Sequence, residues 1–426
     1  MLTLGQIREN NGDQVIEKLK VKNFDANVTV KKILSLDQKR RELQMKADAL
    51  QNEMNNLSRK IGQLFKEGKP SEANAAKEQT GKLKEEIKVL SQQQAETSGE
   101  LDELLVVLPN IPHNSVPGGK TAADNKEIRS GGIIPKLDKS ALPHWELASK
   151  YNLIDFELGN KITGSGFPVY IDKGARLQRA LINFFLDENI SAGYTEVIPP
   201  FVVNADSGFG TTQLPDKEGQ MYHVTLDDFY LIPTAEVPVT NIYRDDILEE
   251  EDFPIKNTAY SPCFRREAGS YGKDVRGLNR LHQFEKVEIV QIAHPDRSYK
   301  ALEEMVTHVE SILGKLELPY RIIQLCGGDM SFASALTFDF EVFSAAQKKW
   351  LEVSSVSNFE TFQSNRLKLR YRDKATKKTA LAHTLNGSSL ALPRIVAALL
   401  ENNQTPEGIR IPTVLHDYAG FKMIDK

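Results

Sequence analysis

The chain has 426 residues and a net charge of −4, so we expect about two or three domains and exclude nucleic-acid binding driven by overall charge. Cys263 and Cys326 are its only cysteines, which excludes a disulfide framework or a cysteine-based zinc site and favours a reducing compartment. The first residues lack an apolar signal core and no apolar run reaches membrane-spanning length, so we expect a soluble cytoplasmic protein without membrane contact.

Residues 33–108 carry apolar side chains at heptad spacing in two stretches. The first stretch contains Ile33, Leu36, Leu43, Ala47, Leu50, Met54, Leu57, Ile61 and Leu64, with Arg40 as a polar break. The second contains Ala76, Thr80, Leu83, Ile87, Leu90, Gln94, Thr97, Leu101 and Leu108. Residues 66–70 (KEGKP) break the helix between them, so the pattern predicts an antiparallel coiled-coil hairpin at about 30–105, within an N-terminal domain 1–108. A spacer or a dimerisation rod would have the same pattern.

Residues 109–130 are rich in proline, glycine, asparagine and serine, which predicts a linker. In residues 131–426, short β-like runs alternate with helical segments without a regular strand–helix repeat. This favours an α+β domain built around an antiparallel sheet. Neither a GxxxxGK[ST] phosphate loop nor a GxGxxG fingerprint occurs, so the sequence does not support a P-loop or Rossmann nucleotide site.

Two segments between the linker and residue 240 combine apolar and polar signals. An amphipathic helix is predicted before a short strand at 193–201 (GYTEVIPPF) that ends in prolines, although a core helix and an edge strand would read the same way. The helix is indicated by Leu177, Leu181, Phe184 and Phe185. Residues 233–236 (PTAE) then follow an apolar run. Their hydroxyl and carboxylate suit an ammonium and a small polar side chain, but such a short sequence more often caps a helix or turn.

Residues 261–290 (SPCFRREAGSYGKDVRGLNRLHQFEKVEIV) are the most informative segment of the chain. An apolar-flanked stretch, a glycine-punctuated basic loop and a returning apolar stretch predict strand, long loop, strand. On the returning strand, side-chain alternation puts Phe284, Lys286 and Glu288 on one face. An aromatic ring and a carboxylate close to an arginine suit a nucleotide base, a phosphate and an amine. A hairpin with an ordinary solvated face is the alternative.

Two segments near the C-terminus carry further polar signals. Residues 350–357 (WLEVSSVS) predict a strand that ends in hydroxyls, which would also fit an exposed strand face. Residues 386–394 (NGSSLALPR) lead into an apolar helix from Ile395. Their Gly-Ser start predicts free backbone N–H groups near a helix N-terminus, which favour anions, and a capped core helix explains the segment equally well.

The run 261–290 resembles motif 2 of the class II aminoacyl-tRNA synthetases, and specifically of the bacterial-type seryl-tRNA synthetase family. The resemblance extends over nearly the whole chain. The helix and strand before residue 201 resemble motif 1, PTAE the family's TAE signature, 352–355 its ExxS sequence, and 386–394 motif 3. Each piece is weak alone, whereas their order, their spacing and the coiled-coil prefix are specific. The resemblance implies an α+β fold in which a class II antiparallel sheet is flanked by helices and follows a long antiparallel helical arm.

The same resemblance implies a serine–tRNA ligase. Such an enzyme activates L-serine with ATP and Mg²⁺ to seryl-adenylate and transfers serine to tRNA(Ser), and to tRNA(Sec) where the host has it. It would be a homodimer whose arm grips the tRNA. We expect positioning and charge stabilisation to carry the catalysis, because neither step needs a covalent enzyme nucleophile.

The implied site residues fall into two sets. The serine-binding set is Thr234, Ala235, Glu236, Glu288 and Ser388. The ATP-binding set is Arg265, Arg266, Glu267, Phe284, Glu352, Val353, Ser354, Ser355 and Arg394. Of these, Arg265, Glu267 and Arg394 are implied to be catalytic. Arg265 would meet the α-phosphate, Glu267 the nucleotide base and Arg394 the distal phosphates, while Phe284 would stack on adenine. Glu352 and Ser355 would hold Mg²⁺ together with ATP.

Two other functions remain open from the sequence. A paralogue could activate serine or another small amino acid for a carrier protein, although that acceptor does not call for a long heptad arm. A catalytically silent tRNA-binding or structural protein could keep the scaffold, although the intact polar residues of the motifs argue against it. Pyrophosphate exchange and tRNA charging separate these alternatives from a ligase.

Overall fold

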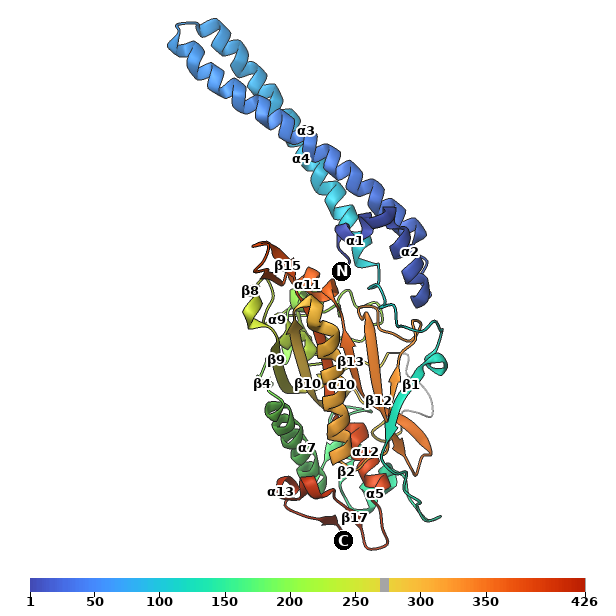
Figure 1. Ribbon diagram of the computed structural model, residues 1–426. Coiled ribbons are helices and arrows are strands. Elements are labelled where there is room, and N and C mark those ends of the chain that lie inside the picture. The colour runs from blue at the N-terminus through green and yellow to red at the C-terminus, as the bar shows by residue number, and fades with distance from the viewer. Residues whose placement is uncertain (269–275, 426) are drawn as a thin grey trace. The chain divides into compact units, whose positions relative to one another are not determined.

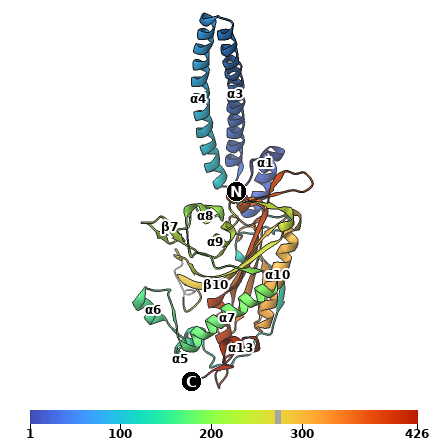
Figure 2. The same cartoon turned by 90° about the vertical axis from the view of Figure 1, so that its left-hand side faces the viewer.

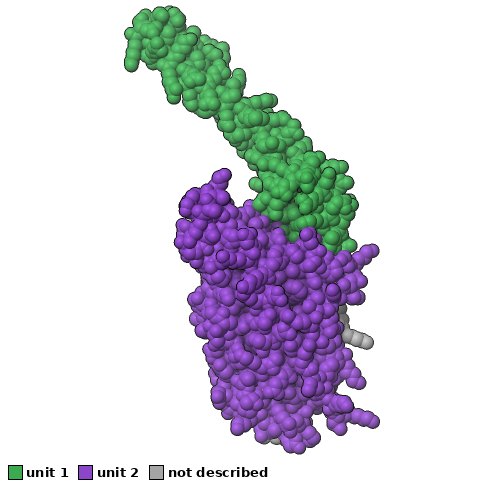
Figure 3. All heavy atoms as spheres, in the orientation of Figure 1, with its two compact units in different colours: residues 1–111 green, residues 112–426 purple. Residues whose placement is uncertain are grey.

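The computed structural model describes residues 1–268 and 276–425. The chain divides into two compact units, residues 1–111 and 112–426 (Figure 3). Within residues 1–268 and 276–425, no helix has both the length and the apolar character that crossing a bilayer requires.

The first unit is a helical hairpin with a small helical base. Helices α3 (Asn27–Lys66) and α4 (Pro70–Val106) lie side by side along their length (Figure 2). Helices α1 (Leu4–Arg8) and α2 (Asp13–Leu19) pack at the start of α3. The predicted antiparallel arm is thereby confirmed. Most buried side chains of the arm lie at heptad positions, among them Ile33, Leu36, Leu43, Ala47, Leu64, Ala76, Leu83, Thr97 and Leu101.

The polar break in the heptad pattern has a structural partner. Arg40 donates to Asp37, at 3.0 Å, and Asp37 is buried with its side chain 1% exposed. Arg8 of α1 also forms two hydrogen bonds to Asp37, at 2.7 and 2.8 Å. The hydrogen bonds from Arg8 lower the pKa of Asp37 to about 2, although burial acts in the opposite direction. An ion cluster therefore joins α1 to α3 where the apolar seam is interrupted.

The second unit is built on an eight-stranded sheet with the order β1-β11-β12-β13-β16-β10-β9-β4 (Figure 1). Neighbouring strands are antiparallel except for the pair β4 and β9. This confirms the predicted antiparallel sheet. The strands are β1 (Lys126–Gly131), β11 (Tyr320–Gln324), β12 (Leu336–Ser344), β13 (Lys349–Asn358), β16 (His383–Ala391), β10 (Gln283–Ala293), β9 (Ile255–Phe264) and β4 (Thr195–Glu196).

The long helices α7 (Asp172–Ser191), α10 (Ser298–Lys315) and α12 (Leu392–Asn402) pack on this sheet (Figures 1 and 2). The amphipathic helix predicted before residue 193 is α7, and its four apolar marker residues are all buried. Helix α12 is buried along most of its length because it lies against the sheet and against helices α5 and α7. The apolar faces of these helices and of the long strands form the core.

Shorter elements surround the sheet. The helices are α5 (His144–Lys150), α6 (Phe156–Ile162), α8 (Ala205–Gly210), α9 (Glu236–Asn241), α11 (Thr361–Leu367) and α13 (His416–Ala419). The strands are β2 (Ile154–Asp155), β3 (Val169–Tyr170), β5 (Val202–Val203), β6 (His223–Val224), β7 (Phe229–Leu231), β8 (Ile247–Glu249), β14 (Arg370–Arg372), β15 (Thr379–Leu381), β17 (Ile409–Arg410) and β18 (Met423–Ile424). Strand β7 ends two residues before the segment 233–236.

The C-terminal end of the predicted linker 109–130 overlaps strand β1. Residues from Lys126 onward form β1, which pairs with β11 at the edge of the large sheet. Before it, the His113 N–H donates to the Ala335 carbonyl at 2.8 Å. The composition hides this strand, because an exposed edge strand needs no apolar alternation.

Candidate active site

The site is organised by the β9–β10 hairpin. Its strands pair without interruption from Phe264 opposite Gln283 to Ile255 opposite Ile292, which confirms the predicted strand, loop and strand. At the base of the loop, the Arg265 N–H donates to the His282 carbonyl at 2.9 Å. The central part of the predicted basic loop, residues 269–275, lies outside the described residues.

Three polar side chains bond to one another on one face of this hairpin. Lys286 Nζ lies 2.7 Å from Glu288 Oε2 and donates to Thr234 Oγ1 at 2.8 Å. The Thr234 hydroxyl donates to the same Glu288 oxygen at 3.1 Å. The predicted alternation is confirmed for Lys286 and Glu288, which share a face. Lys286 had no predicted role in the site, although its position two residues before Glu288 was a usable signal.

Glu236 adds a second buried carboxylate to this face. It begins α9, and its N–H donates to Thr234 Oγ1 at 3.2 Å, so the threonine hydroxyl contacts the first residue of the helix. Gln363 Nε2 donates to Glu236 Oε1 at 2.6 Å, and the Thr384 hydroxyl donates to Gln363 Oε1 at 2.6 Å. Gln363 and Thr384 belong to segments that carry no recognisable motif, so the sequence could not connect them to this pocket.

Burial dominates the electrostatics of the two carboxylates. It raises the pKa of Glu236 to about 7, with a further contribution from the negative charge of Glu288. Burial also raises the pKa of Glu288, although the neighbouring Lys286 opposes the shift. The pocket therefore holds negative charge that is poorly solvated and that an incoming ammonium group would stabilise.

Ser388 lies directly opposite Glu288 in the pairing of β10 with β16, and Ala235 is fully buried beside Thr234. The prediction of free backbone N–H groups near a helix N-terminus at the Gly-Ser sequence is wrong, because this sequence lies in a strand. Gly387 and Ser388 are inside β16, where Gly387 pairs with both Ile289 and Val356, and α12 begins only at Leu392. The backbone N–H groups of this segment serve the sheet and offer no helix N-terminus to an anion.

A β-bulge explains the ExxS sequence. In a regular strand, residues three apart point to opposite faces. Here the register between β12 and β13 shifts, so that Ser355 opposes Asp339 while Glu352 opposes Glu341. Because directly opposed residues share a face, the bulge at Val353 brings Glu352 and Ser355 to the same face.

Asp339 is a member of this face that sequence reasoning missed. It is half-buried, and its buried Oδ1 has no hydrogen-bond partner among the described residues. Burial, together with the charge of Glu352, raises its pKa well above the ordinary value, while a hydrogen bond from Ser355 opposes the shift. The sequence signal for this residue was an acidic side chain in a strand whose apolar and polar residues alternate (LTFDFEVFS).

Arg394 connects this face to the hairpin. It lies in the first turn of α12, and its Nε donates to the Asn279 carbonyl at 3.1 Å. Its Nη1 donates to the Glu352 carbonyl at 2.7 Å and lies 3.7 Å from the Glu352 carboxylate. The neighbouring Val353 is buried in the core, and the Ser354 hydroxyl donates to the Ser388 carbonyl at 2.5 Å.

Arg265 lies between the two halves of the site. Its guanidinium is 5.2 Å from the ring centroid of Phe284, and its Nε donates to the Pro233 carbonyl at 3.4 Å. An adenine that stacks on Phe284 must therefore use the other face of the ring or displace the arginine. Glu267 pairs with Arg280 at 3.1 Å across the base of the loop.

A cavity of about 1060 Å³ opens beside the loop and is lined by Arg266, Glu267, Arg280 and His282 together with residues of α5, α6 and the segment after α6. The residues of the buried carboxylate pocket do not line it. The cavity is large enough for a nucleotide-sized group.

The acidic face of β12 and β13 fits a magnesium ion that is shared with phosphates. Glu352 and Ser355 supply oxygen ligands, which Mg²⁺ prefers. Within residues 1–268 and 276–425, no cluster of three or more histidine, cysteine, aspartate or glutamate side chains could hold a metal by itself. This donor set suits a metal that takes most of its ligands from a nucleotide.

Known proteins resemble the chain over its full length. Residues 1–112 match the seryl-tRNA synthetase N-terminal domain, and residues 222–403 match the tRNA synthetase class II core domain (G, H, P, S and T). A serine–tRNA ligase of Salinibacter ruber is 53% identical over 425 residues, covering 100% of this chain and 99% of its own length. One from Gloeothece citriformis is 45% identical over 432 residues, covering 100% of both chains.

A solved structure resembles the chain as closely in three dimensions. The seryl-tRNA synthetase of Pyrococcus horikoshii, complexed with ATP, superposes with a TM-score of 0.93 at 34% identity, covering 100% of this chain and 99% of that one. Together with the arm, the antiparallel sheet and the motif geometry, these matches assign the family. The chain belongs to the seryl-tRNA synthetases, a family of class II aminoacyl-tRNA synthetases.

Proposed function

We propose that the β9–β10 face and the adjoining ends of β13 and β16 are where this serine–tRNA ligase joins L-serine to ATP and then passes serine to tRNA. The observation that carries the assignment is the pair of buried carboxylates: that of Glu288 is bonded to the Thr234 hydroxyl and to Lys286, and that of Glu236 to the Gln363 amide. Such a site suits a small amino acid with an ammonium and a hydroxyl, because both groups find charged or polar partners without water.

Serine binding would use Thr234, Ala235, Glu236, Glu288 and Ser388. One carboxylate neutralises the ammonium, and the other accepts a hydrogen bond from the serine hydroxyl. Alanine would leave that acceptor unpaired, which can discriminate by up to about 10⁴-fold in polar sites. Threonine would be excluded by crowding, since fully buried Ala235 and nearly buried Ser388 leave little room for an extra methyl group.

ATP binding would use Arg265, Arg266, Glu267, Phe284, Glu352, Val353, Ser354, Ser355 and Arg394. Arg265 reaches from the Phe284 ring to the Pro233 carbonyl and so stands between the amino acid pocket and the nucleotide side. We assign it to the α-phosphate, where it meets the charge that develops when the serine carboxylate attacks. Arg394 binds the distal phosphates, Glu267 contacts the base and Phe284 stacks on adenine.

Magnesium would be held by Glu352 and Ser355 together with the phosphates, with Asp339 behind Ser355. When bound, it would neutralise phosphate charge and orient the leaving pyrophosphate. The protein's own part is to keep both oxygen ligands on one face through the bulge at Val353.

The reaction has two steps, adenylate formation and transfer to tRNA. The serine carboxylate oxygen bonds to the α-phosphorus, and the bond to the leaving pyrophosphate breaks. A hydroxyl of the terminal tRNA adenosine then attacks the carbonyl carbon, which releases AMP. Both steps depend on alignment, for which several charged groups fixed by hydrogen bonds are suited.

The tRNA partner would be tRNA(Ser), with tRNA(Sec) as a second substrate where the host has it. The paired helices α3 and α4 support this role, because recognition of an RNA helix by shape needs a long rigid surface more than base contacts. The N-terminal tRNA-binding domain would span 1–108, with the arm at about 30–105, and the catalytic domain would span 131–426 together with strand β1, which begins at Lys126.

The working form would be a cytoplasmic homodimer. Apolar side chains are exposed at the end of α7 and in the segment after β4, which supports an interface there. They are Ile190 (44% exposed), Ile198 (86%), Phe201 (37%) and Val202 (40%). Cys263 and Cys326 are free and buried, which suits a reducing compartment. Light scattering on the purified protein measures the dimer directly.

The experiment that tests the function combines two assays on the full chain. Serine-dependent ATP–pyrophosphate exchange reports adenylate formation, and charging of a tRNA(Ser) transcript reports transfer. We expect both. Exchange without charging would favour a carrier-protein paralogue, and binding of tRNA without exchange would favour a silent scaffold.

A further inference from the structure

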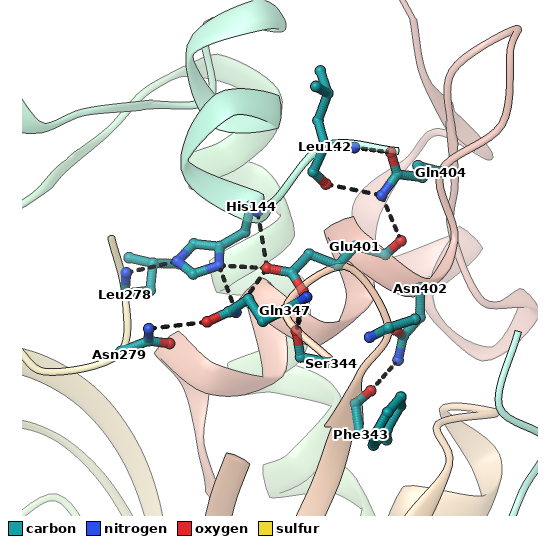
Figure 4. A network of polar contacts seen from close by, with 11 residues as sticks. Leu142, His144, Leu278, Asn279, Phe343, Ser344, Gln347, Glu401, Asn402 and Gln404 are labelled. Atoms are coloured by element: carbon teal, nitrogen blue, oxygen red, sulfur yellow. Dashed lines mark hydrogen bonds and ion pairs between the residues drawn. The ribbon is translucent and has the colours of Figure 1, made fainter. Parts of the chain in front are cut away.

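A buried polar network lies behind the site, between α5, α12 and the returning end of the hairpin loop (Figure 4). Its centre is the carboxylate of Glu401 on α12, which is 0% exposed, as is His144 at the start of α5. Glu401 Oε1 accepts from His144 Nδ1 at 2.7 Å, from the His144 N–H at 2.9 Å and from Gln347 at 2.8 Å. Its other oxygen accepts from the Ser344 hydroxyl.

The second ring nitrogen of His144 holds the loop. The Leu278 N–H donates to His144 Nε2 at 2.8 Å. A backbone N–H can only donate, so Nε2 must be the acceptor and Nδ1 must carry the proton toward Glu401. Gly277 is needed here, because a Cβ atom at that position would lie 2.2 Å from Nε2. One imidazole therefore joins the loop backbone to α12.

The network continues to Arg394 through one residue. Asn279 Nδ2 donates to Gln347 Oε1 at 3.2 Å, and Gln347 in turn holds Glu401. The Asn279 carbonyl accepts from Arg394 Nε at 3.1 Å. Arg394 and Glu401 both belong to α12, about two helical turns apart, so the loop segment 277–279 is fastened to one helix at two points.

A purely structural anchor would not need a charge at this place. Burying a carboxylate is costly unless all its hydrogen bonds are made, and well-packed apolar groups commonly stabilise as much. Here the bonds are made: burial acts to raise the pKa of Glu401, but the hydrogen bonds from His144 and Ser344 outweigh it and keep the pKa below its ordinary value. What such a network adds over apolar packing is a fixed direction for each bonded group.

We propose that His144 and Glu401 are positioning residues for ATP: through Leu278, Asn279 and Gln347 they set the place of the loop backbone that orients the Arg394 guanidinium. The proposal rests on the proposed function of Arg394 in binding the distal phosphates. Neither His144 nor Glu401 touches the substrate. Their effect on the reaction passes through the carbonyl of Asn279.

The first test is His144→Phe, which keeps a ring but loses both hydrogen bonds. We expect KM for ATP in serine-dependent pyrophosphate exchange to rise about tenfold while KM for serine stays within about twofold. The matched control is Gln404→Ala. Gln404 bonds the backbone of Leu142, just before α5, at 2.8 and 2.9 Å, and it bonds the backbone carbonyl of Glu401 on α12 at 2.8 Å, away from the Glu401 carboxylate and the loop. It should lower the melting temperature and leave both KM values unchanged.

The second test asks whether the effect passes through Arg394. In an Arg394→Ala background, His144→Phe should cost less than about twofold in kcat/KM for ATP, because the group it positions is gone. Gln347→Leu, at a partly exposed turn position, provides an independent break of the network and should raise KM for ATP alone. ATP affinity measured by calorimetry gives the same comparison without turnover.

Three outcomes would overturn the proposal. The first is that His144→Phe raises KM for ATP and KM for serine equally, and the second is that its effect on kcat/KM for ATP is fully additive with that of Arg394→Ala. The third is an unchanged KM for ATP in both His144→Phe and Gln347→Leu. If His144→Phe does not fold, Gln347→Leu alone decides. Absence of exchange in the unsubstituted enzyme would instead refute the proposed function, so the two failures are distinguishable.

Discussion

The two halves of the proposed site, a serine side and a phosphate side, differ in how many hydrogen bonds their polar groups already make within the protein. On the serine side, Glu288 is 2% exposed, Thr234 5% and Glu236 9%, and each is bonded to other protein groups. On the phosphate side, the side chain of Glu352 is 52% exposed and that of Arg394 26%, and they lie 3.7 Å apart. The polar bonds of the proposed serine pocket are thus made within the protein, whereas the proposed phosphate side presents charges to solvent.

This difference follows the chemistry of the two ligands. A small amino acid offers few groups, so selectivity requires acceptors that are fixed, dry and costly to leave unpaired. A triphosphate with its metal brings several charges, so exposed arginine and carboxylate groups can stay solvated until it binds and then pair with it. Substitutions on the phosphate side should therefore affect ATP and the chemical step, and those in the pocket should affect serine.

The largest effect is expected for Arg265→Ala. It removes the cation proposed for the α-phosphate, so pyrophosphate exchange should fall by about 10³-fold. Fold and tRNA binding should persist, because Arg265 makes one long backbone hydrogen bond and a contact with Phe284. Melting temperature and tRNA affinity are the controls, and exchange equal to that of the unsubstituted enzyme would sink the assignment.

Glu288→Gln should be the next largest and should act on the other substrate. The glutamine amide keeps the shape of the side chain but loses the negative charge, which pairs with Lys286 and is proposed to bind serine. The kcat/KM for serine should therefore fall by about 10²-fold. KM for ATP should change little. A parallel loss for both substrates would erase the distinction between the two halves.

The pH dependence of serine binding should report Glu236. Its pKa is raised to about 7, so the carboxylate loses its charge below that pH, and kcat/KM for serine should fall by about tenfold per pH unit below 7. Stability has the opposite sign. The raised pKa makes the folded protein bind protons more readily than the unfolded chain, so this group's contribution to stability declines as pH rises from its ordinary value of 4.5 to about 7.

Glu236→Gln is the control for that profile. The variant has no titrating group at this position, so its serine kcat/KM should be lower at neutral pH and should lose the dependence near pH 7. A pH profile that is the same in both proteins would assign the titration to a different group.

The smallest effect is expected for Phe284→Leu. A leucine keeps the apolar contact but loses ring stacking with adenine, which corresponds to about 1 kcal/mol, so KM for ATP should rise about fivefold. The Arg265–Phe284 contact is lost as well. A rise in KM for serine without one for ATP would place this ring on the wrong side of the site.

The elements that sequence patterns predicted correctly are those with a local periodic signal. The heptads gave the α3–α4 arm, and the alternation of Lys286 and Glu288 gave a shared strand face. The Gly-Ser sequence at Gly387 was misread because glycine there serves close strand packing: an added Cβ would lie 2.8 Å from Val356. Composition alone could not distinguish that need from a helix start.

The partners that the sequence could not supply meet only in three dimensions. Gln363 reaches Glu236 from α11, Asp339 meets Ser355 across a β-bulge, and Glu401 reaches the loop through His144. Gln363, Asp339, Glu401 and His144 lie outside the motifs that the chain displays locally. Their contacts depend on strand register and helix packing, which are set by the whole sheet.

Exchange kinetics with serine, alanine, threonine and cysteine on the purified enzyme test the preassembled serine pocket most directly. The account predicts efficient exchange with serine and a kcat/KM at least about 10³-fold lower with alanine, because the hydroxyl partners go unpaired. Threonine should be rejected by crowding. A kcat/KM for alanine within about tenfold of that for serine would show that the bonded carboxylates of this pocket do not recognise the serine hydroxyl, which would contradict the proposed role of the pocket.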